Sequence, residues 1–386
     1  MGNEGLGAPE LEQLVDRAAA ETGLREYGDD EFNEAISIFI ASANESAGLT
    51  EAGVAAVEAE MHRVLVNRMR FAEDLRLHPE ILEEDVSDPI IVLGMPRTGT
   101  TKLQRLMSAD PGVQRLDYWR LLNPAPFPGE SAGEARIEAA HRAVEATKAM
   151  MPNWESSHPI GAWEVDEEVY LQVFTCKSFI QTTNFHTPVY QNWMSTQPLD
   201  STYSYMKQLL QYLQWQDGGR QGRPWILKSP VHMATTDLLV DLFPESTLVY
   251  SHRDLFTAFA SICRLMQTAW EFFHGTPDLK ALGQVVRDTF LADLEKHMAL
   301  RKSMGDKLDI LDIQYEDIRA DAMKVVGQIY AKAGREFSEE RRQAMLDWEA
   351  GNLQHAKGRL EYRLEDYGVT REMIASDCPT YLAEFG

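Results

Sequence analysis

The chain has 386 residues, of which 44% are hydrophobic and 25% are charged, and its formal net charge is −23. This length is too great for one small core and is consistent with one large α/β domain plus an extension. The acidic excess argues against nucleic acid and anionic membranes as general partners, because both would repel a surface of the same sign. An anionic small ligand would need a local basic pocket, so basic residues within motifs carry more information than usual.

The three cysteines, Cys176, Cys263 and Cys378, are far apart, and no Cys or His spacing suggests a metal site. Reduced thiols in a cytoplasmic protein are therefore expected. The acidic first residues contain no apolar stretch typical of a signal peptide, and no apolar run approaches the roughly 18 residues of a membrane span. We expect a cytoplasmic protein with no membrane-spanning segment and no bound metal.

The first part of the chain is predicted to be helical. Apolar residues recur at helical spacing in residues 9–23, and again in a long amphipathic segment that starts at Thr50, a suitable N-cap, and runs to about residue 81. Pro89 then ends the helical pattern. We therefore divide the chain into a helical N-terminal extension, residues 1–88, and an α/β domain, residues 89–386.

Strand and helix patterns alternate through the second part. Helical patterns separate the expected strands and are found at 199–215, 232–243, 255–272 and 279–304, while the strands are expected at 90–93, 224–227, 246–250 and 307–313. Such alternation predicts a three-layer α/β fold, a parallel sheet flanked by helices. The stretch 123–198 is rich in Pro, Ser, Trp and Asn and is expected to cover the end of the sheet where ligands usually bind.

The turn after the first strand, GMPRTGTTK from Gly94 to Lys102, predicts an anion site. A strand, a glycine turn and a helix start together point backbone N–H groups at an anion. The two glycines have the spacing of a P-loop ATPase, but Thr100 stands where the lysine that bridges the β- and γ-phosphates belongs. With Arg97 as the cation, the loop favours a single phosphate-like chain over a metal-clamped triphosphate.

The segment PRTGTT, residues 96–101, resembles the 5′-phosphosulfate loop of the sulfotransferases that use 3′-phosphoadenylyl sulfate (PAPS), in the form found in their broad bacterial branch and in the protein-tyrosine sulfotransferases. The resemblance covers about residues 89–386 and implies a P-loop-like fold with PAPS as co-substrate and no metal. It implies that the phosphosulfate end of PAPS is bound by Arg97, Thr98, Gly99, Thr100 and Thr101.

Two further segments match the same family. In STLVYSHRDLFTAFAS, Arg253 follows a strand and Ser261 lies eight residues later, the pair that in the family binds the 3′-phosphate. In HAKGRLEYRLEDYG, which is similar to a later basic turn of the family, Lys357 and Arg359 are candidates for the same phosphate. A surface position explains these last two charges equally well.

The segment ILKSPVH resembles the element of the bacterial branch that supplies the chemistry. Lys228 at its strand end would neutralise the charge on the leaving oxygen. His232 is expected to take the proton of the acceptor hydroxyl, because imidazole has a pKa of about 6.5 and suits proton transfer at neutral pH. The alternative for His232 is a side chain that only forms hydrogen bonds.

One departure from the family concerns the base. Related proteins often carry a Trp-Glu pair after the loop, but here Trp119 is followed by Arg120. One reading of this departure is that Arg120 binds an anionic acceptor. The acids and the histidine that remain as candidate bases are Asp117, His158, Glu164, Asp166, Glu167 and Glu168.

The resemblance implies a PAPS-dependent sulfotransferase that moves a sulfuryl group to a hydroxyl of a small-molecule acceptor. The many aromatic residues between 118 and 215 favour a lipophilic acceptor, although core packing explains aromatic residues equally well. The alternatives are a P-loop kinase acting on a small molecule and a nucleotide-binding protein without turnover. No nucleic-acid partner is expected.

Overall fold

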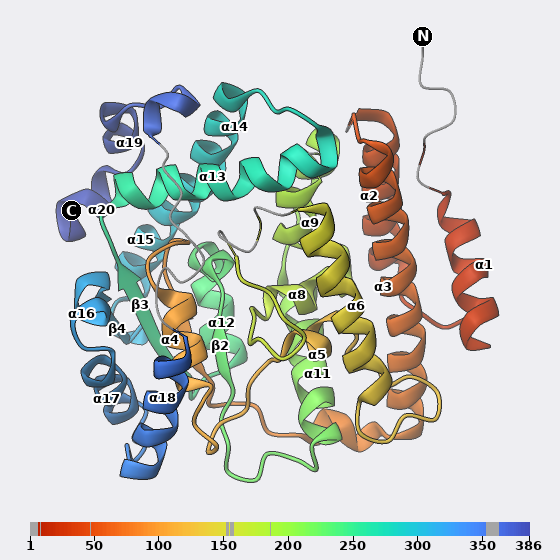
Figure 1. Cartoon of the computed structure of the whole chain (residues 1–386), viewed down its shortest axis with the longest axis horizontal. Coiled ribbons are helices and arrows are strands. Elements are labelled where there is room, and N and C mark those ends of the chain that lie inside the picture. The colour runs from red at the N-terminus through yellow and green to blue at the C-terminus, as the bar shows by residue number, and fades with distance from the viewer. Residues whose placement is uncertain are drawn as a thin grey trace.

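The computed structural model describes residues 7, 9–46, 48–151, 154, 158–185, 187–352 and 363–386. Lys357 and Arg359, the candidates of the later basic turn, lie outside these residues. A parallel sheet lies in the α/β part with helices on both faces, and the first three helices lie side by side at one flank of the molecule (Figure 1). The predicted α/β fold is confirmed.

The sheet has four parallel strands in the order β2-β1-β3-β4, and these are β1 (Ile90–Leu93), β2 (Ile226–Lys228), β3 (Thr247–His252) and β4 (Ile310–Gln314). In the register, Ile91 of β1 pairs with Leu227 on one side and with Leu248 on the other. β1 and β3 are buried along their whole length, which explains the apolar runs 90–93 and 248–250 within them. All four predicted strands are present, although the last begins late because residues 305–307 form a 3₁₀ turn.

The helices alternate with the strands and cover both faces of the sheet. Their bounds are α1 (Leu11–Thr22), α2 (Asp30–Ser46), α3 (Glu51–Leu77), α4 (Thr100–Met107), α5 (Tyr118–Leu122), α6 (Glu134–Met150), α8 (Val169–Gln172), α9 (Phe179–Asn184), α10 (Pro188–Met194), α11 (Asp200–Gln216), α12 (Thr236–Leu242), α13 (Leu255–His274), α14 (Leu279–Val286), α15 (Ala292–Met304), α16 (Tyr315–Ala320), α17 (Ala322–Lys332), α18 (Glu339–Gly351), α19 (Arg371–Asp377) and α20 (Pro379–Phe385).

Two of the predicted helices are interrupted. The helix expected at 232–243 begins as a 3₁₀ turn, Pro230–Thr235, and becomes α-helical only at α12. The helix expected at 279–304 is α14 and α15 joined by a π-helical turn, Arg287–Leu291.

Alternate residues of the strands point into two different cores. Ile90 and Val92 of β1 pack with α4 and α17 on one face, whereas Ile91 and Leu93 belong to the larger core on the other face. This alternation follows from the two-residue period of a strand, and it produces the three-layer arrangement.

The N-terminal helices share the larger core. Leu14 of α1, Ile36 of α2 and Met61 of α3 belong to the same buried cluster as Phe259 of α13. Thr50 caps α3 as expected, since its hydroxyl accepts from the backbone N–H of Gly53 at 3.0 Å. The division of the chain at residue 88 stays a prediction, because the helices before it have no core of their own.

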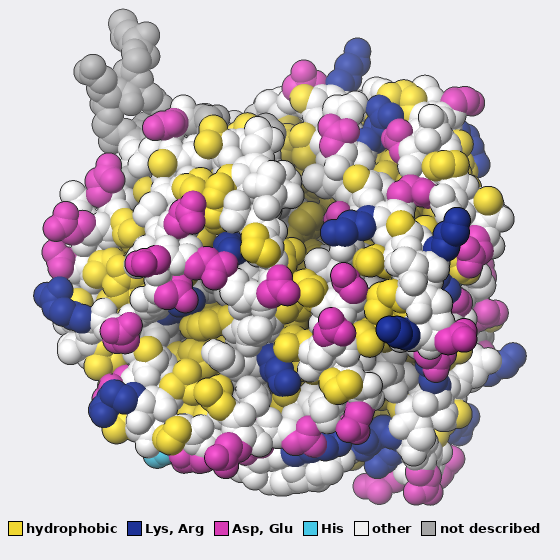
Figure 2. Space-filling model, turned by 180° about the vertical axis from the view of Figure 1, so that it is seen from behind, with side chains coloured by type: hydrophobic (Ala, Val, Ile, Leu, Met, Phe, Trp, Pro, Cys, Tyr) yellow, Lys and Arg dark blue, Asp and Glu magenta, His cyan; other side chains and the backbone are white. Residues whose placement is uncertain are grey.

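Within the described parts of the chain, no helix has the length and apolar character needed to cross a membrane. The same residues contain no group of three or more His, Cys, Asp or Glu side chains that could hold a metal ion. Figure 2 shows acidic and basic side chains mixed with hydrophobic ones over one face, without a broad patch of a single charge.

The contact between α3 and α13 tests how the N-terminal helices are docked. A Cβ added at Gly53 would lie 2.5 Å from the carbonyl oxygen of Phe273. Gly53→Ala should therefore destabilise the protein by about 1–3 kcal/mol through overpacking, although alanine favours a helix by about 1 kcal/mol over glycine. Gly327→Ala in α17 is the matched control, because its nearest neighbour lies at an ordinary 3.5 Å. Urea unfolding midpoints measure both changes, and equal stabilisation of the two variants would contradict the docking.

Candidate functional site

The turn between β1 and α4 can be made only with glycine at two positions. Gly94 has a φ of +135°, and a Cβ there would lie 2.7 Å from the carbonyl oxygen of Ser251. Gly99 has a φ of +87°, and a Cβ there would lie 2.9 Å from the ring of Tyr315. Both the backbone conformation and the lack of space therefore exclude a side chain. The glycine spacing seen in the sequence is thus a requirement of this turn.

The loop is held in shape from inside. Thr98 is buried, and its hydroxyl donates to the carbonyl of Met95 at 2.7 Å. The hydroxyl of Ser251, on β3, donates to the carbonyl of Thr98 at 2.6 Å. The side chain of Thr98 is therefore used within the loop, whereas Thr100 and Thr101 line the cavity beside it.

The two predicted anchors for the donor meet at Arg97. The Nε of Arg97 donates to the hydroxyl of Ser261 at 3.0 Å, across 164 residues of sequence. The guanidinium of Arg253 donates to the carbonyl of Arg97 at 2.6 Å and lies over the ring of Tyr315, 4.2 Å from its centre. The structure thus brings the loop, the end of β3 and the first turns of α13 together at one place.

Lys228 ends β2 in the same region and is 1% exposed. Its Nζ forms an ion pair with Glu167, whose other carboxylate oxygen accepts from the hydroxyl of Ser229 at 3.1 Å. The backbone N–H of Lys228 donates to Glu168 at 2.7 Å. Two adjacent carboxylates of the connection before α8 therefore fix the end of β2 and its lysine.

A cavity of about 190 Å³ lies where these segments meet. Its walls include Arg97, Thr101, Lys228 and Arg253, together with Glu167. Positive charge is thus concentrated at the N-terminus of α4, on a chain that is strongly acidic as a whole. Cationic side chains and a helix N-terminus around one cavity suit an anion with more than one phosphate-like group.

His232 does not reach this cavity. Its side chain is fully buried, and its Nε2 lies 2.7 Å from Glu168 while its Nδ1 lies 2.7 Å from the hydroxyl of Tyr203. Both ring nitrogens are thus occupied by protein groups, because the 3₁₀ turn directs this side chain into the core. These contacts favour the alternative that the side chain of His232 only forms hydrogen bonds, and its role as the base stays a prediction.

Two other predicted candidates do face the cavity, Glu167 and His158. The Nε2 of His158 lies 2.9 Å from a carboxylate oxygen of the buried Asp166. Burial by itself would raise the pKa of Asp166, but the charge and hydrogen bond of His158, with Lys228 and Arg105, lower that pKa to about 2. Asp166 is therefore an anion that orients the histidine.

Arg120 and the candidate bases Asp117 and Glu164 are not among the residues that line this cavity. Arg120 is buried, forms a 2.9 Å ion pair with Asp217 and donates to the carbonyl of Leu213, so it offers no site for an anionic acceptor. Burial raises the pKa of Asp117 to about 6, but neither this residue nor Glu164 lines the cavity beside the loop. The departure from the family at residue 120 is thus a structural contact between α5 and the end of α11.

A second cavity, of about 120 Å³, adjoins the first. The two share five lining residues, and among them are Glu167 and His158. Its remaining walls are mainly apolar and include Val169, Phe179 and Met266. Some aromatic residues of the region between 118 and 215 therefore line a cavity, as predicted, whereas others such as Tyr190 are fully buried in the core.

Tyr315 is a residue of the site that the sequence analysis did not single out. Its ring supports Arg253 and stands against Gly99, at the carboxyl end of β4. The signal that could have found it is its position directly after a strand of the parallel sheet, since residues at that edge surround ligands.

A parallel sheet with a glycine turn after β1, and with basic side chains at the ends of β2 and β3 meeting at that turn, defines a P-loop-like fold with a candidate anion site. The model of the sulfotransferase family matches residues 89–339, and the chain belongs to this family.

The comparisons also identify individual relatives. The omega-hydroxy-beta-dihydromenaquinone-9 sulfotransferases Stf3 of Mycobacterium bovis and Mycobacterium tuberculosis are each 24% identical to this chain over 266 residues. The match spans 66% of this chain and 65% of the length of these relatives.

Two solved structures are similar over nearly the whole chain. Sulfotransferase STF9 from Mycobacterium avium has a TM-score of 0.86 and 26% identity, with 100% of this chain and 98% of that chain covered. Sulfotransferase STF1 from Mycobacterium tuberculosis has a TM-score of 0.76 and 27% identity, with 96% of this chain and 98% of that chain covered. The likeness therefore includes the N-terminal helices as well as the α/β part.

The buried environment of His232 allows a test of whether this residue is the base or has a structural role. His232→Ala leaves one oxygen of the buried Glu168 without its hydrogen-bond partner, and a buried polar group left unsatisfied costs about 1–3 kcal/mol or more. The urea unfolding midpoint should fall accordingly, and turnover should fall by the same factor for acceptors of high and low pKa. A fully stable variant that loses turnover mainly with aliphatic alcohols would restore His232 as the base.

Proposed function

We propose that the protein transfers the sulfuryl group of PAPS to a hydroxyl of a small lipophilic acceptor. The observation that carries the proposal is the junction of two cavities, one basic beside the phosphate loop and one mainly apolar, with Glu167 and His158 in the wall that both share. Membership of the sulfotransferase family supports the reaction. The Stf3 relatives, whose name describes sulfation of an omega-hydroxy menaquinone, support a hydroxyl on a lipophilic acceptor.

The donor would bind along the loop with its two ends at different anchors. Arg97, Gly99, Thr100 and Thr101, with the backbone of Thr98, would hold the phosphosulfate at the N-terminus of α4. Arg253 and Ser261 would hold the 3′-phosphate, and an anion there would replace the present contact between Arg97 and Ser261. Lys357 and Arg359 remain proposed as further contacts to the same phosphate.

In the transfer step, the acceptor oxygen forms a bond to sulfur while the bond from sulfur to the 5′-phosphate oxygen breaks. The electron pair of that bond stays on the phosphate oxygen, where Lys228 and the N–H groups of α4 stabilise the new charge. The proton of the acceptor hydroxyl passes to the carboxylate of Glu167, which lies between the two cavities. When Lys228 turns toward the donor, it releases Glu167 to accept this proton.

A kinase is the less favoured reading of the same fold. Its phosphate loop would need a lysine at the position of Thr100, where this chain has a hydroxyl. A protein that binds the nucleotide without turnover would show the ligand response below and no transfer to any acceptor.

Donor binding is the first test of the function. Adenosine 3′,5′-bisphosphate should raise the melting temperature, because a ligand that binds only the folded protein stabilises it by mass action. ATP with Mg²⁺ should raise the melting temperature much less. Equal stabilisation by ATP and Mg²⁺ would exclude the sulfotransferase proposal.

The Arg253→Ala variant tests the anchor of the 3′-phosphate. Its affinity for the bisphosphate should fall about ten- to hundredfold, as expected for the loss of a charge-assisted hydrogen bond. Its affinity for adenosine 5′-phosphosulfate, which has no 3′-phosphate, should fall little.

The position of the base is tested with two matched variants. Glu167→Gln keeps the shape of the side chain but cannot take a proton, so turnover should fall by about 10²- to 10⁴-fold. Donor affinity should be unchanged or higher, because Lys228 loses its competing carboxylate. His158→Gln should stay within about threefold of wild type. A larger loss in His158→Gln than in Glu167→Gln would assign the proton to the pair of His158 and Asp166 instead.

A further inference from the structure

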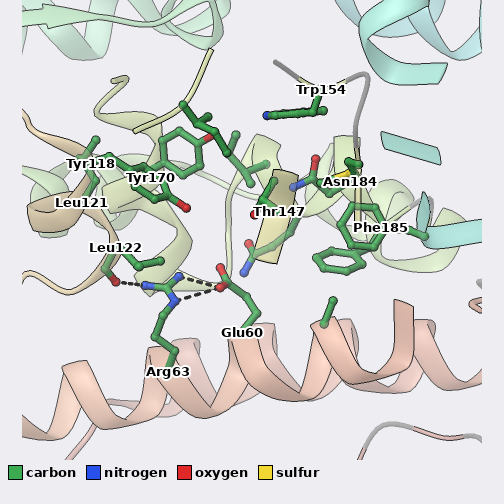
Figure 3. A pocket seen from close by; sticks show the side chains of 16 residues that line it. Glu60, Arg63, Tyr118, Leu121, Leu122, Thr147, Trp154, Tyr170, Asn184 and Phe185 are labelled. Carbon is green, nitrogen blue, oxygen red and sulfur yellow. Dashed lines mark hydrogen bonds and ion pairs between the residues drawn. The ribbon is translucent and has the colours of Figure 1, made fainter. Parts of the chain in front are cut away.

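A third cavity, of about 230 Å³, lies between the N-terminal helices and the connections that follow the phosphate loop. One of its walls is α3, which contributes Ala56, Glu60 and Arg63. These positions share one face of the helix because they are four and three residues apart. Figure 3 shows Glu60 and Arg63 rising from α3 toward Leu122, with Asn184 and Phe185 on the other side of the cavity.

This cavity adjoins the apolar cavity of the acceptor. The two share Tyr170, Ile180 and Asn184 among their lining residues. Each alone is smaller than the roughly 300 Å³ at which small-molecule sites begin, whereas the two together exceed that size. An elongated acceptor that extends from the loop to α3 would therefore fill a site of ordinary volume.

The far end of this site contains polar groups with hydrogen-bonding capacity left over. Arg63 donates twice to one oxygen of Glu60, at 3.0 and 2.7 Å, and also donates to the carbonyl of Leu122. The second carboxylate oxygen of Glu60 accepts no hydrogen bond from any residue that the structure describes, and the same holds for the amide of Asn184. The hydroxyl of Tyr118 is a further such group, and burial raises its pKa to about 12, so that it stays neutral.

The charges of this end decide which ligand group it fits. Arg63 is already neutralised by Glu60, so the pair offers no net positive charge to a carboxylate or phosphate. The available carboxylate oxygen accepts a hydrogen bond, and the amide of Asn184 can donate or accept one. A hydroxyl satisfies both, whereas an anion would be repelled by Glu60.

We propose that this cavity binds the end of the acceptor remote from the sulfated hydroxyl, and that this end carries an uncharged hydrogen-bonding group such as a second hydroxyl. The proposal rests on the proposed function, because it takes the first hydroxyl to lie at the phosphate loop. It also makes α3 a part of the acceptor site.

Three compounds of equal length test the proposal: α,ω-decanediol, decanol and ω-hydroxydecanoate. Their affinities are measured by calorimetry with adenosine 3′,5′-bisphosphate bound, so that the result does not depend on turnover. The diol should bind about tenfold more tightly than decanol, as expected for a hydrogen bond to a charged group, and the hydroxy acid should bind most weakly.

In the Glu60→Gln variant the preference for the diol over the hydroxy acid should be reversed, because Arg63 is left with an uncompensated charge. The hydroxy acid should gain at least about tenfold relative to the diol. Glu73→Gln is the matched control, since Glu73 forms the same kind of ion pair with Arg76 on α3 but lines none of the three cavities. It should leave the affinity ratios unchanged.

The two proposals fail in different ways. Equal affinities of the three compounds, or a Glu60→Gln variant with the ratios of the wild type, would overturn the distal site whether or not sulfate is transferred. Failure to sulfate the bound diol, with the predicted affinity ratios intact, would overturn the transfer reaction and leave the distal site standing.

Discussion

The buried ion pair between Lys228 and Glu167 is the interaction on which the site depends. Lys228 is 1% exposed as a residue, and burying its ammonium group costs several kcal/mol in desolvation unless a partner compensates the charge. Glu167 supplies that charge, and the next residue, Glu168, binds both the backbone of Lys228 and the ring of His232. The connection before α8 is therefore fixed to the end of β2, and this attachment brings Glu167 and His158 to the wall between the two cavities.

The same pair explains how one lysine can serve an anion in an acidic protein. The formal net charge of −23 would keep an anionic ligand away from most of the surface. At the phosphate loop, Arg97, Lys228 and Arg253 line one cavity together with the N-terminus of α4. These cations therefore form a local basic site within an acidic protein.

The N-terminal helices are part of the site's construction. They share the larger core with the helices that cover the sheet, and α3 contacts α13 at the glycine that lets the two backbones approach. Through Glu60 and Arg63 the same helix forms a wall of the third cavity. The two solved sulfotransferases described above also match the chain across this region.

The sequence alone determined the glycine turn after the first strand and the parallel sheet, whereas the residues that bind the donor stay a prediction. These features are local, because a positive φ at Gly94 and Gly99 and an apolar run before them are properties of a few consecutive residues. Tertiary structure alone decided the direction of each reactive side chain. His232 and Glu167 were both candidate bases in the sequence. Packing between segments more than 60 residues apart places His232 in the core and Glu167 at the cavity. The pattern of a single segment contains no information about which side chain of another segment will meet it.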